Sequence, residues 1–317
     1  MGDFKKAIDY HKKHLDIAIE KGDKIGEGAA YCNLGRAYRW SDDIKQALGF
    51  HNSDLCIAKE LEDKAGEGNS YGNLGNDYES LRNFKQAMEY HKKHLSIAKE
   101  VGDRAGEGDA YGNLGRAYRA TGDFRKSKEY HLIQLNIAKE VGDRVGEGLA
   151  CGSLGKVYHS VGDFQKSFYY MTKALSIVKE VGEKAREGRA SDNLGRAFQG
   201  VGHFNQAIKY HNQGLSISKE VGDRIGEGRA YSNLGTPYYG VKDFKEAIRY
   251  HHMHLSIVKE VGDKAGEGDA YGNLGRAFKG LGNFDIAIEY HNQQLSIAKQ
   301  VGDMSGEGNA CFALGCL

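Results

Sequence analysis

Hydrophobic and polar positions follow a pattern that returns every 40 residues without insertion or deletion. Leucines occupy one phase of this pattern, and a glycine follows each of them: Leu34, Leu74, Leu114, Leu154, Leu194, Leu234, Leu274 and Leu314. Glycines occupy a second phase: Gly28, Gly68, Gly108, Gly148, Gly188, Gly228, Gly268 and Gly308. A fixed period of this length predicts a solenoid, in which each unit stacks only on its neighbours.

Each repeat contains two helical patterns. In the first, Tyr111 and Leu114 belong to a set with the i, i+3, i+7 spacing of one helical face, which predicts a helix over 104–120. A second apolar stripe predicts a helix over 83–100. Only a few residues separate such helices, so each pair must be antiparallel. We call the two types helix A and helix B.

The pattern predicts that residues 1–317 form a single array of repeats. A half unit over 1–20 contains a helix B, seven complete units cover 21–300, and a half unit over 301–317 contains most of a helix A. Neither end shows a polar capping helix, although arrays need caps for solubility. We therefore expect either that the chain is a fragment of a longer array or that it associates end to end with itself.

Two glycines open helix A, in the element Gly106-Glu107-Gly108. A glycine in a helix costs up to about 1 kcal/mol relative to alanine, so their recurrence needs a structural reason. We expect a close approach between neighbouring units at this point.

The array resembles the tetratricopeptide repeat (TPR), a helix-turn-helix motif with aromatic, Leu-Gly and Tyr positions on helix A and Ala and aromatic positions on helix B. The matching residues are Tyr111, Leu114, Gly115, Tyr118, Ala87, His91 and His94. The usual terminal proline is absent, and each unit is six residues longer than the motif. Forty-residue units with GDRxGEGxAYxNLG are similar to those of the LGN/Pins adaptors and of tetratricopeptide repeat protein 28. The resemblance implies an all-α, right-handed superhelix with peptide binding along helix A, in cell polarity, spindle orientation or G-protein signalling.

Polar residues that flank the Leu-Gly pair form the candidate binding site. Asn and Arg recur three residues apart there, so they are neighbours on one helical face. Asn can bond to a peptide backbone, and Arg can hold a carboxylate with two hydrogen bonds. The candidate peptide-binding residues are Asn33, Arg36, Asn73, Asn76, Asn113, Arg116, Lys156, Asn193, Arg196, Asn233, Asn273 and Arg276.

Charge on this face differs from that of the whole chain. The stripe carries ten cations and four anions, whereas the chain has a formal net charge of +1. We therefore expect a groove for an extended acidic peptide segment of a protein partner. The alternative is a solvated polar stripe in which Asn and Arg bond between units.

Composition limits the other functions. With 44 Lys+Arg against 43 Asp+Glu, the chain lacks the basic excess of a nucleic-acid binder, so a helical-repeat RNA binder is the weakest alternative. No run of 18 apolar residues occurs, which argues against a membrane span or a signal peptide. The five cysteines form no C-x-x-C pair, which favours a reducing compartment. We expect a cytoplasmic protein, with the cell cortex as a further location.

Catalytic and metal-binding motifs are incomplete. His91/His94, like His11/His14 and His251/His254, could hold a metal, but other repeats have Met171 and Ala174 at these positions, which favours packing. Gly155-Lys156 is not followed by Ser or Thr, so it forms no P-loop, and no dinucleotide fingerprint occurs. We predict no metal, no cofactor and no enzymatic activity. A structural or self-associating spacer is the main alternative to a peptide scaffold.

Overall fold

A computed structural model describes residues 4–316, which form sixteen helices and no strand. Contacts divide the chain into two compact units, Met1–Asp163 and Phe164–Leu317. The first contains α1 (Phe4–Lys21), α2 (Lys24–Trp40), α3 (Ile44–Glu60), α4 (Lys64–Ser80), α5 (Phe84–Val101), α6 (Arg104–Ala120), α7 (Phe124–Glu140) and α8 (Arg144–Ser160). The second contains α9 (Phe164–Val181), α10 (Lys184–Gly200), α11 (Phe204–Glu220), α12 (Arg224–Gly240), α13 (Phe244–Val261), α14 (Lys264–Gly280), α15 (Phe284–Val301) and α16 (Met304–Gly315).

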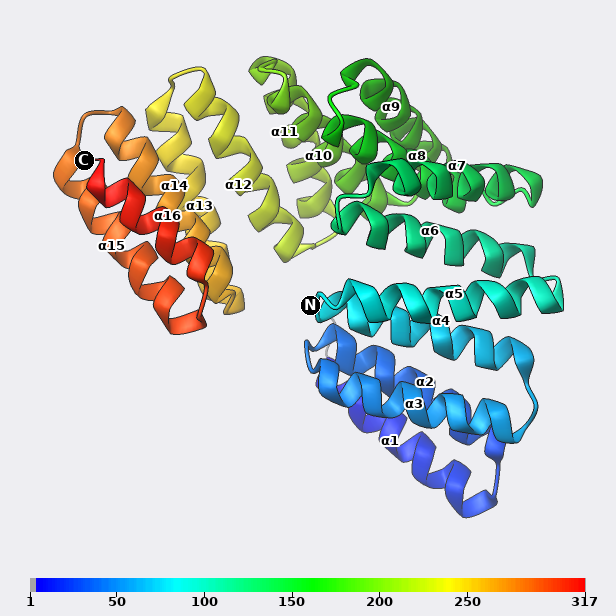
Figure 1. Ribbon diagram of the computed structural model, residues 1–317. Coiled ribbons are helices and arrows are strands. Elements are labelled where there is room, and N and C mark those ends of the chain that lie inside the picture. Colours follow the sequence, from blue (N-terminus) through cyan, green and yellow to red (C-terminus); the bar gives the residue numbers. More distant parts are fainter. Residues whose placement is uncertain (1–3, 317) are drawn as a thin grey trace. The chain divides into compact units, whose positions relative to one another are not determined.

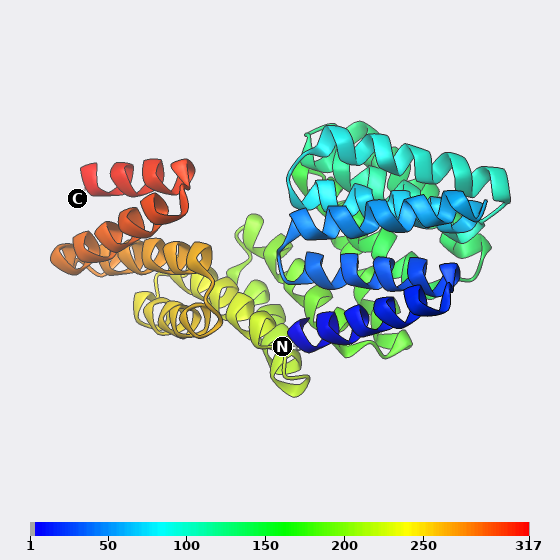
Figure 2. The ribbon, with the colours of Figure 1, turned by 90° about the horizontal axis from the view of Figure 1, so that it is seen from below.

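Helices A and B alternate along both units. The even-numbered helices are of type A and the odd-numbered ones of type B, and within each unit every helix packs against the next (Figures 1 and 2). The helix predicted over 104–120 is α6, and the one predicted over 83–100 is α5, shifted by one residue. The all-α solenoid of helix pairs is confirmed. Its right-handed winding, and its continuity as one array over 1–317, stay predictions.

A cap at the start of helix A explains its first glycine. Asp103 Oδ1 accepts a hydrogen bond from the Gly106 N–H at 2.9 Å, and the same bond opens α2, α4, α8, α12 and α14. A Cβ built on Gly106 would clash with the other oxygen of Asp103. The tightest contact is therefore with the cap of the same helix, and the expected close approach between units is not the main reason for this glycine.

Helix α10 shows the converse arrangement. Its cap residue is Glu183, which makes no cap hydrogen bond, and Arg186 replaces the glycine and pairs with Glu183. The second glycine of the element has a different neighbour, because a Cβ on Gly108 would lie 3.3 Å from Ile137 Cγ2 on the paired helix α7.

The caps yield a stability prediction. Asp103→Ala should lower the free energy of unfolding by about 1 kcal/mol, because the Gly106 N–H loses its partner. Urea unfolding monitored by circular dichroism measures this loss. Glu183→Ala is the matched control and should change the stability by less, since Glu183 caps nothing. Equal losses in both variants would contradict the assignment of the cap.

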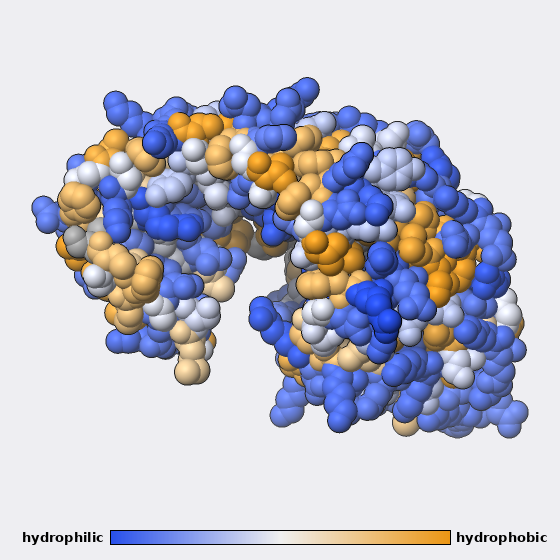
Figure 3. Space-filling view, turned by 45° about the horizontal axis from the view of Figure 1, so that its top comes forward, coloured by the Kyte–Doolittle hydropathy of each residue, from blue (hydrophilic) through white to orange (hydrophobic). Residues whose placement is uncertain are grey.

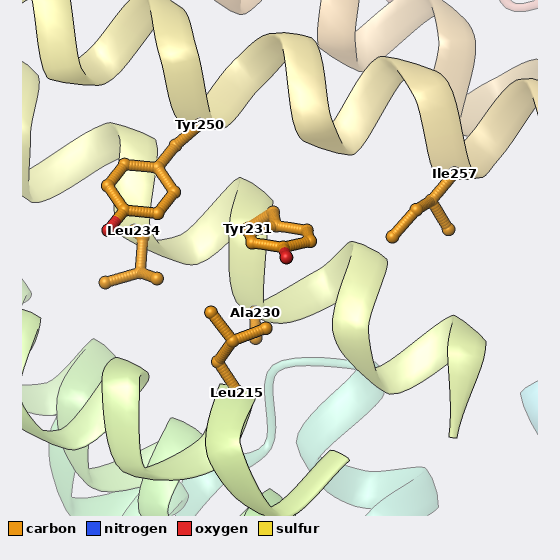
Figure 4. Packing of buried hydrophobic residues seen from close by; sticks show 6 residues of the cluster. All are labelled: Leu215, Ala230, Tyr231, Leu234, Tyr250 and Ile257. Carbon is orange, nitrogen blue, oxygen red and sulfur yellow. The ribbon is translucent and has the colours of Figure 1, made fainter. Parts of the chain in front are cut away.

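The core of each repeat is formed where one helix A packs between two helices B. Figure 4 shows Leu234 and Tyr231 of α12 between Leu215 of α11 and Tyr250 and Ile257 of α13. Leu234 is fully buried, and the equivalent leucines from Leu34 to Leu274 are buried as well. The leucine phase of the sequence is therefore the centre of the core.

The glycine after each core leucine makes room for an imidazole. A Cβ on Gly115 would lie 2.7 Å from the ring of His131 on the paired helix B. The same glycine–histidine contact joins these pairs: Gly35 and His51, Gly75 and His91, Gly195 and His211, Gly235 and His251, Gly275 and His291. These six histidines are buried, so they pack in the core.

The histidine pairs considered as metal ligands follow this packing, with one exception. His91, His94, His251 and His254 are buried between helices. His14 is exposed and His11 only half-buried, so the packing interpretation is wrong for His14. The reason is that α1 packs against α2 alone among the described helices, which leaves its other face uncovered.

Facing side chains of paired helices also match in size one helical turn away from the glycine–histidine contact. Gly112 accommodates Gln134, whose amide would lie 2.5 Å from an added Cβ. In α10 and α11 the sizes are reversed, because Asp192 fills the space opposite Gly214, where a Cβ would lie 2.7 Å from the Asp192 carboxylate. Each helix A is therefore fitted to its own helix B.

Candidate functional site

Helix A forms the inner side of each unit. In the first unit α2, α4, α6 and α8 contact one another in succession, and in the second unit α10, α12, α14 and α16 do the same. Within each unit, no described helix B contacts another helix B. Because the A helices are closer together, each unit curves toward its A side. The predicted binding residues all lie on A helices.

The candidate residues form an accessible stripe along the A helices. The cations of the set are exposed: Arg36, Arg116, Lys156, Arg196 and Arg276. The asparagines are half-buried: Asn33, Asn73, Asn76, Asn113, Asn193, Asn233 and Asn273. Each asparagine that directly precedes a Leu-Gly pair has an exposed residue four positions before it, such as Arg189 or Arg229. These residues extend the stripe by one helical turn. We call this set the A stripe.

In the first unit, ion pairs connect consecutive A helices. Arg116 on α6 donates to Asn76 Oδ1 at 3.1 Å and to Glu79 at 3.3 Å on α4. Arg39 on α2 donates to Asp77 Oδ1 at 3.1 Å and to the Asn73 carbonyl at 3.3 Å. Arg39 and Arg116 therefore make the bonds between repeats that the alternative interpretation of the polar stripe expects.

The acidic partners of these arginines are partly or fully buried. Burial raises the pKa of Glu79, but the hydrogen bond with His91 and the Arg116 charge outweigh it and hold this pKa below its usual value. Asp77 is completely buried and also contacts His51 Nδ1 at 2.5 Å. Sequence reasoning did not single out Asp77, although its signal was present: Asp77 is the one acidic residue at a position of the repeat that is otherwise Ala, Val, Pro or Leu.

A shallow depression lies on the A side of the first unit. It has a volume of about 390 Å³ and is lined by Arg39, Asn76, Glu79 and Ser80. Its lining is polar, with Arg39 and Glu79 already engaged in the ion pairs described above. On the face that Figure 3 shows, hydrophobic areas are scattered among hydrophilic side chains rather than gathered into one patch.

The second unit presents its arginines differently. Arg189, Arg196 and Arg229 are exposed, and none has a hydrogen-bond or ion-pair partner among the described residues. Arg276 bonds to Asn273 on its own helix α14. The sequence pattern treated the A stripe as uniform, whereas in the structure Arg39 and Arg116 of the first unit are paired with α4, and Arg189, Arg196 and Arg229 of the second unit are not paired within residues 4–316.

Within residues 4–316, no cluster of three or more His, Cys, Asp and Glu side chains is arranged to hold a metal ion. None of the described helices combines the length and the apolar character of a membrane span.

Solved structures with the same fold were found by comparison. The quorum sensor NprR from B. thuringiensis, in its apo form, is 15% identical with a TM-score of 0.73, covering 92% of this chain and 83% of that chain. A Rap protein complexed with competence and sporulation factor is 13% identical with a TM-score of 0.68, covering 99% and 97%. A STAND protein with a tetratricopeptide repeat sensor from Pyrococcus horikoshii is 17% identical with a TM-score of 0.70, covering 97% of this chain and 48% of its own. At these identities the likeness shows the fold alone.

The sequence itself was compared with known proteins and families. No curated protein matches the chain. The family model described as "Tetratricopeptide repeat" matches residues 66–140, 147–220 and 226–300, which together exceed half of the sequence. The chain therefore belongs to the tetratricopeptide repeat family.

Proposed function

We propose that this chain is a non-catalytic protein-interaction scaffold that holds an extended acidic peptide segment along its A helices. One observation carries the proposal: the A stripe combines half-buried asparagines with exposed arginines on the side toward which each unit curves. Cations that remain unpaired in the folded protein are free to bind carboxylates of a partner.

The asparagines suit the backbone of such a ligand. Asn193, Asn233 and Asn273 occur once per repeat on neighbouring A helices of the second unit, and each amide offers both a donor and an acceptor. An extended peptide exposes its own N–H and C=O groups at regular intervals, since it makes no internal hydrogen bonds. Asparagines would therefore hold the peptide backbone, and arginines would select acidic side chains.

The structural neighbours support a binding function for this type of array. One is named as a quorum sensor, and another is a complex with competence and sporulation factor. The resemblance of the repeats to those of the LGN/Pins adaptors adds a cellular context, in which we propose a cytoplasmic or cortical scaffold in polarity or spindle-orientation signalling.

An array of random 12-residue peptides tests the proposed function. The full chain should retain a subset of peptides enriched in Asp and Glu. Asn193→Ala, Asn233→Ala and Asn273→Ala in combination should reduce this retention at least fivefold, because the backbone contacts are lost. The matched control replaces Asn205, Asn212 and Asn292, which are exposed on B helices. The proposal fails if no peptide is retained, or if the control variant loses as much binding.

A further inference from the structure

We infer that the acidic part of the ligand is received by Arg189, Arg196 and Arg229 on α10 and α12, and not by Arg39 and Arg116 in the first unit. The inference rests on the proposed function and goes beyond it, because it assigns the charge-recognising contacts to one section of the A stripe. Its basis is that Arg39 and Arg116 are ion-paired within the part of the chain that the structure describes, whereas Arg189, Arg196 and Arg229 are not.

Helix α4 neutralises the cations beside it. Where α6 has Arg116, Ala117 and Arg119, the equivalent residues of α4 are polar or acidic: Asn76, Asp77 and Glu79. These three side chains accept the hydrogen bonds of Arg39 and Arg116. A ligand carboxylate would have to displace a partner that is already in place, and drawing Arg39 away would cost the buried Asp77 carboxylate its arginine partner.

The equivalent positions of the second unit hold no carboxylate. Arg276 of α14 stands in the register of Arg116, but α12 offers Thr236 and Tyr239 where α4 offers Asn76 and Glu79. Arg276 accordingly bonds to Asn273 of its own helix. Helix α12 therefore cannot neutralise its neighbours as α4 does.

The acidic residues near Arg189, Arg196 and Arg229 do not neutralise these arginines. Asp192 on α10 is buried and bonds to His211 Nδ1 at 3.1 Å, so it faces the core. Asp269 is exposed, but it lies one repeat further, on α14, at the position that Arg229 has on α12. The three arginines of α10 and α12 thus stand together without an acidic partner among the described residues.

The spacing of these arginines matches a simple peptide pattern. Arg189 and Arg196 are seven residues apart on α10, which is two helical turns or about 10.5 Å. A peptide in the extended polyproline II conformation has three residues per turn and advances about 3.1 Å per residue, so carboxylates three residues apart lie on one face about 9 Å apart. Arg229, on the contacting helix α12, provides a third site for a further carboxylate.

Two fluorescein-labelled peptides test the inference with the full chain. The probe is (Glu-Ser-Gly)4, and its neutral counterpart is (Gln-Ser-Gly)4. Fluorescence anisotropy should show binding of the first and at least tenfold weaker binding of the second. Replacing Arg189, Arg196 and Arg229 by Gln together should weaken binding of the acidic probe at least tenfold. Replacing Arg39 and Arg116 by Gln removes the two paired cations of the first unit and should change this binding less than threefold.

Each outcome supports or overturns the inference. Equal loss in both variants, or a larger loss in the first-unit variant, overturns it, provided that circular dichroism shows both variants folded. Retention of peptides on the random array without binding of (Glu-Ser-Gly)4 also overturns it, while the proposed scaffold function survives. Tighter binding of a 12-nucleotide oligouridylate than of the acidic peptide overturns it in favour of RNA. An array that retains nothing removes the proposed function itself.

Discussion

Lowering the pH from 7 to 4 should destabilise the folded chain by several kcal/mol. Burial lowers the pKa of His131 from 6.5 to about 4, against the opposing effect of its hydrogen bond to Gln134 Oε1, and lowers the pKa of His251 to about 3. Between pH 6.5 and these values the unfolded chain binds protons that the folded chain excludes, so the free energy of unfolding falls as the pH falls. At 1.36 kcal/mol per pKa unit, His131 alone contributes a loss of ~3 kcal/mol.

Urea unfolding at pH 8, 6.5, 5 and 4 measures this dependence. Methionine is the natural choice for the variants, because Met171 occupies the equivalent position of α9. The double variant His131→Met, His251→Met should have a shallower pH dependence than the wild-type chain. The difference at pH 8 reports packing alone, since the histidines are then neutral in both states. Parallel curves over the whole range would show that these two imidazoles do not control acid stability.

Gly235→Ala should destabilise the second unit by about 1–2 kcal/mol. The added Cβ would clash with the ring of His251, which is 3% exposed and enclosed by neighbouring helices. Alanine also favours the helix by up to about 1 kcal/mol relative to glycine, so the steric cost must exceed this gain. Thermal and urea unfolding of the single variant give the net effect.

Two further variants identify the cause of that effect. Gly49→Ala on α3 is the matched control, because nothing lies within 4 Å of the added Cβ, and it should leave stability unchanged or raise it. Gly235→Ala combined with His251→Ala should lose less than the sum of the two single variants, since truncating the ring frees the space. Strict additivity would mean that Gly235 and His251 do not compete for volume.

Most of the fold could be predicted from the sequence, because the same pattern of helical positions occurs in every repeat. Leu114 and Tyr111 were enough to predict the helix and its buried face. The reason for Gly106 could not be read in this way, because a glycine at that position is equally compatible with a close approach between units. Only the position of the Asp103 carboxylate distinguishes the two explanations.

The candidate site was predicted as a type of surface but not in its detail. The spacing of Asn113 and Arg116 is enough to place both on one face of a helix. Whether Arg116 is free depends on Asn76 and Glu79, which are about one repeat earlier and meet it only through the register of neighbouring helices. A pattern within one helix carries no information about that register, so the paired and unpaired arginines looked alike.

Because the facing side chains of paired helices match in size, neither helix of a repeat can be replaced without its partner. Exchanging α10 for α6 would place Gly112 opposite Gly214 and leave a hole, whereas exchanging α11 for α7 would set Gln134 against Asp192. The same size matching would be needed if two copies of the chain associated head to tail so that the 40-residue repeat continued across the junction. Phe312, which is 75% exposed, would then meet His14, although every complete pair has at least one small residue there. Near-identical repeats are thus not interchangeable modules, and each boundary between partners is individually matched.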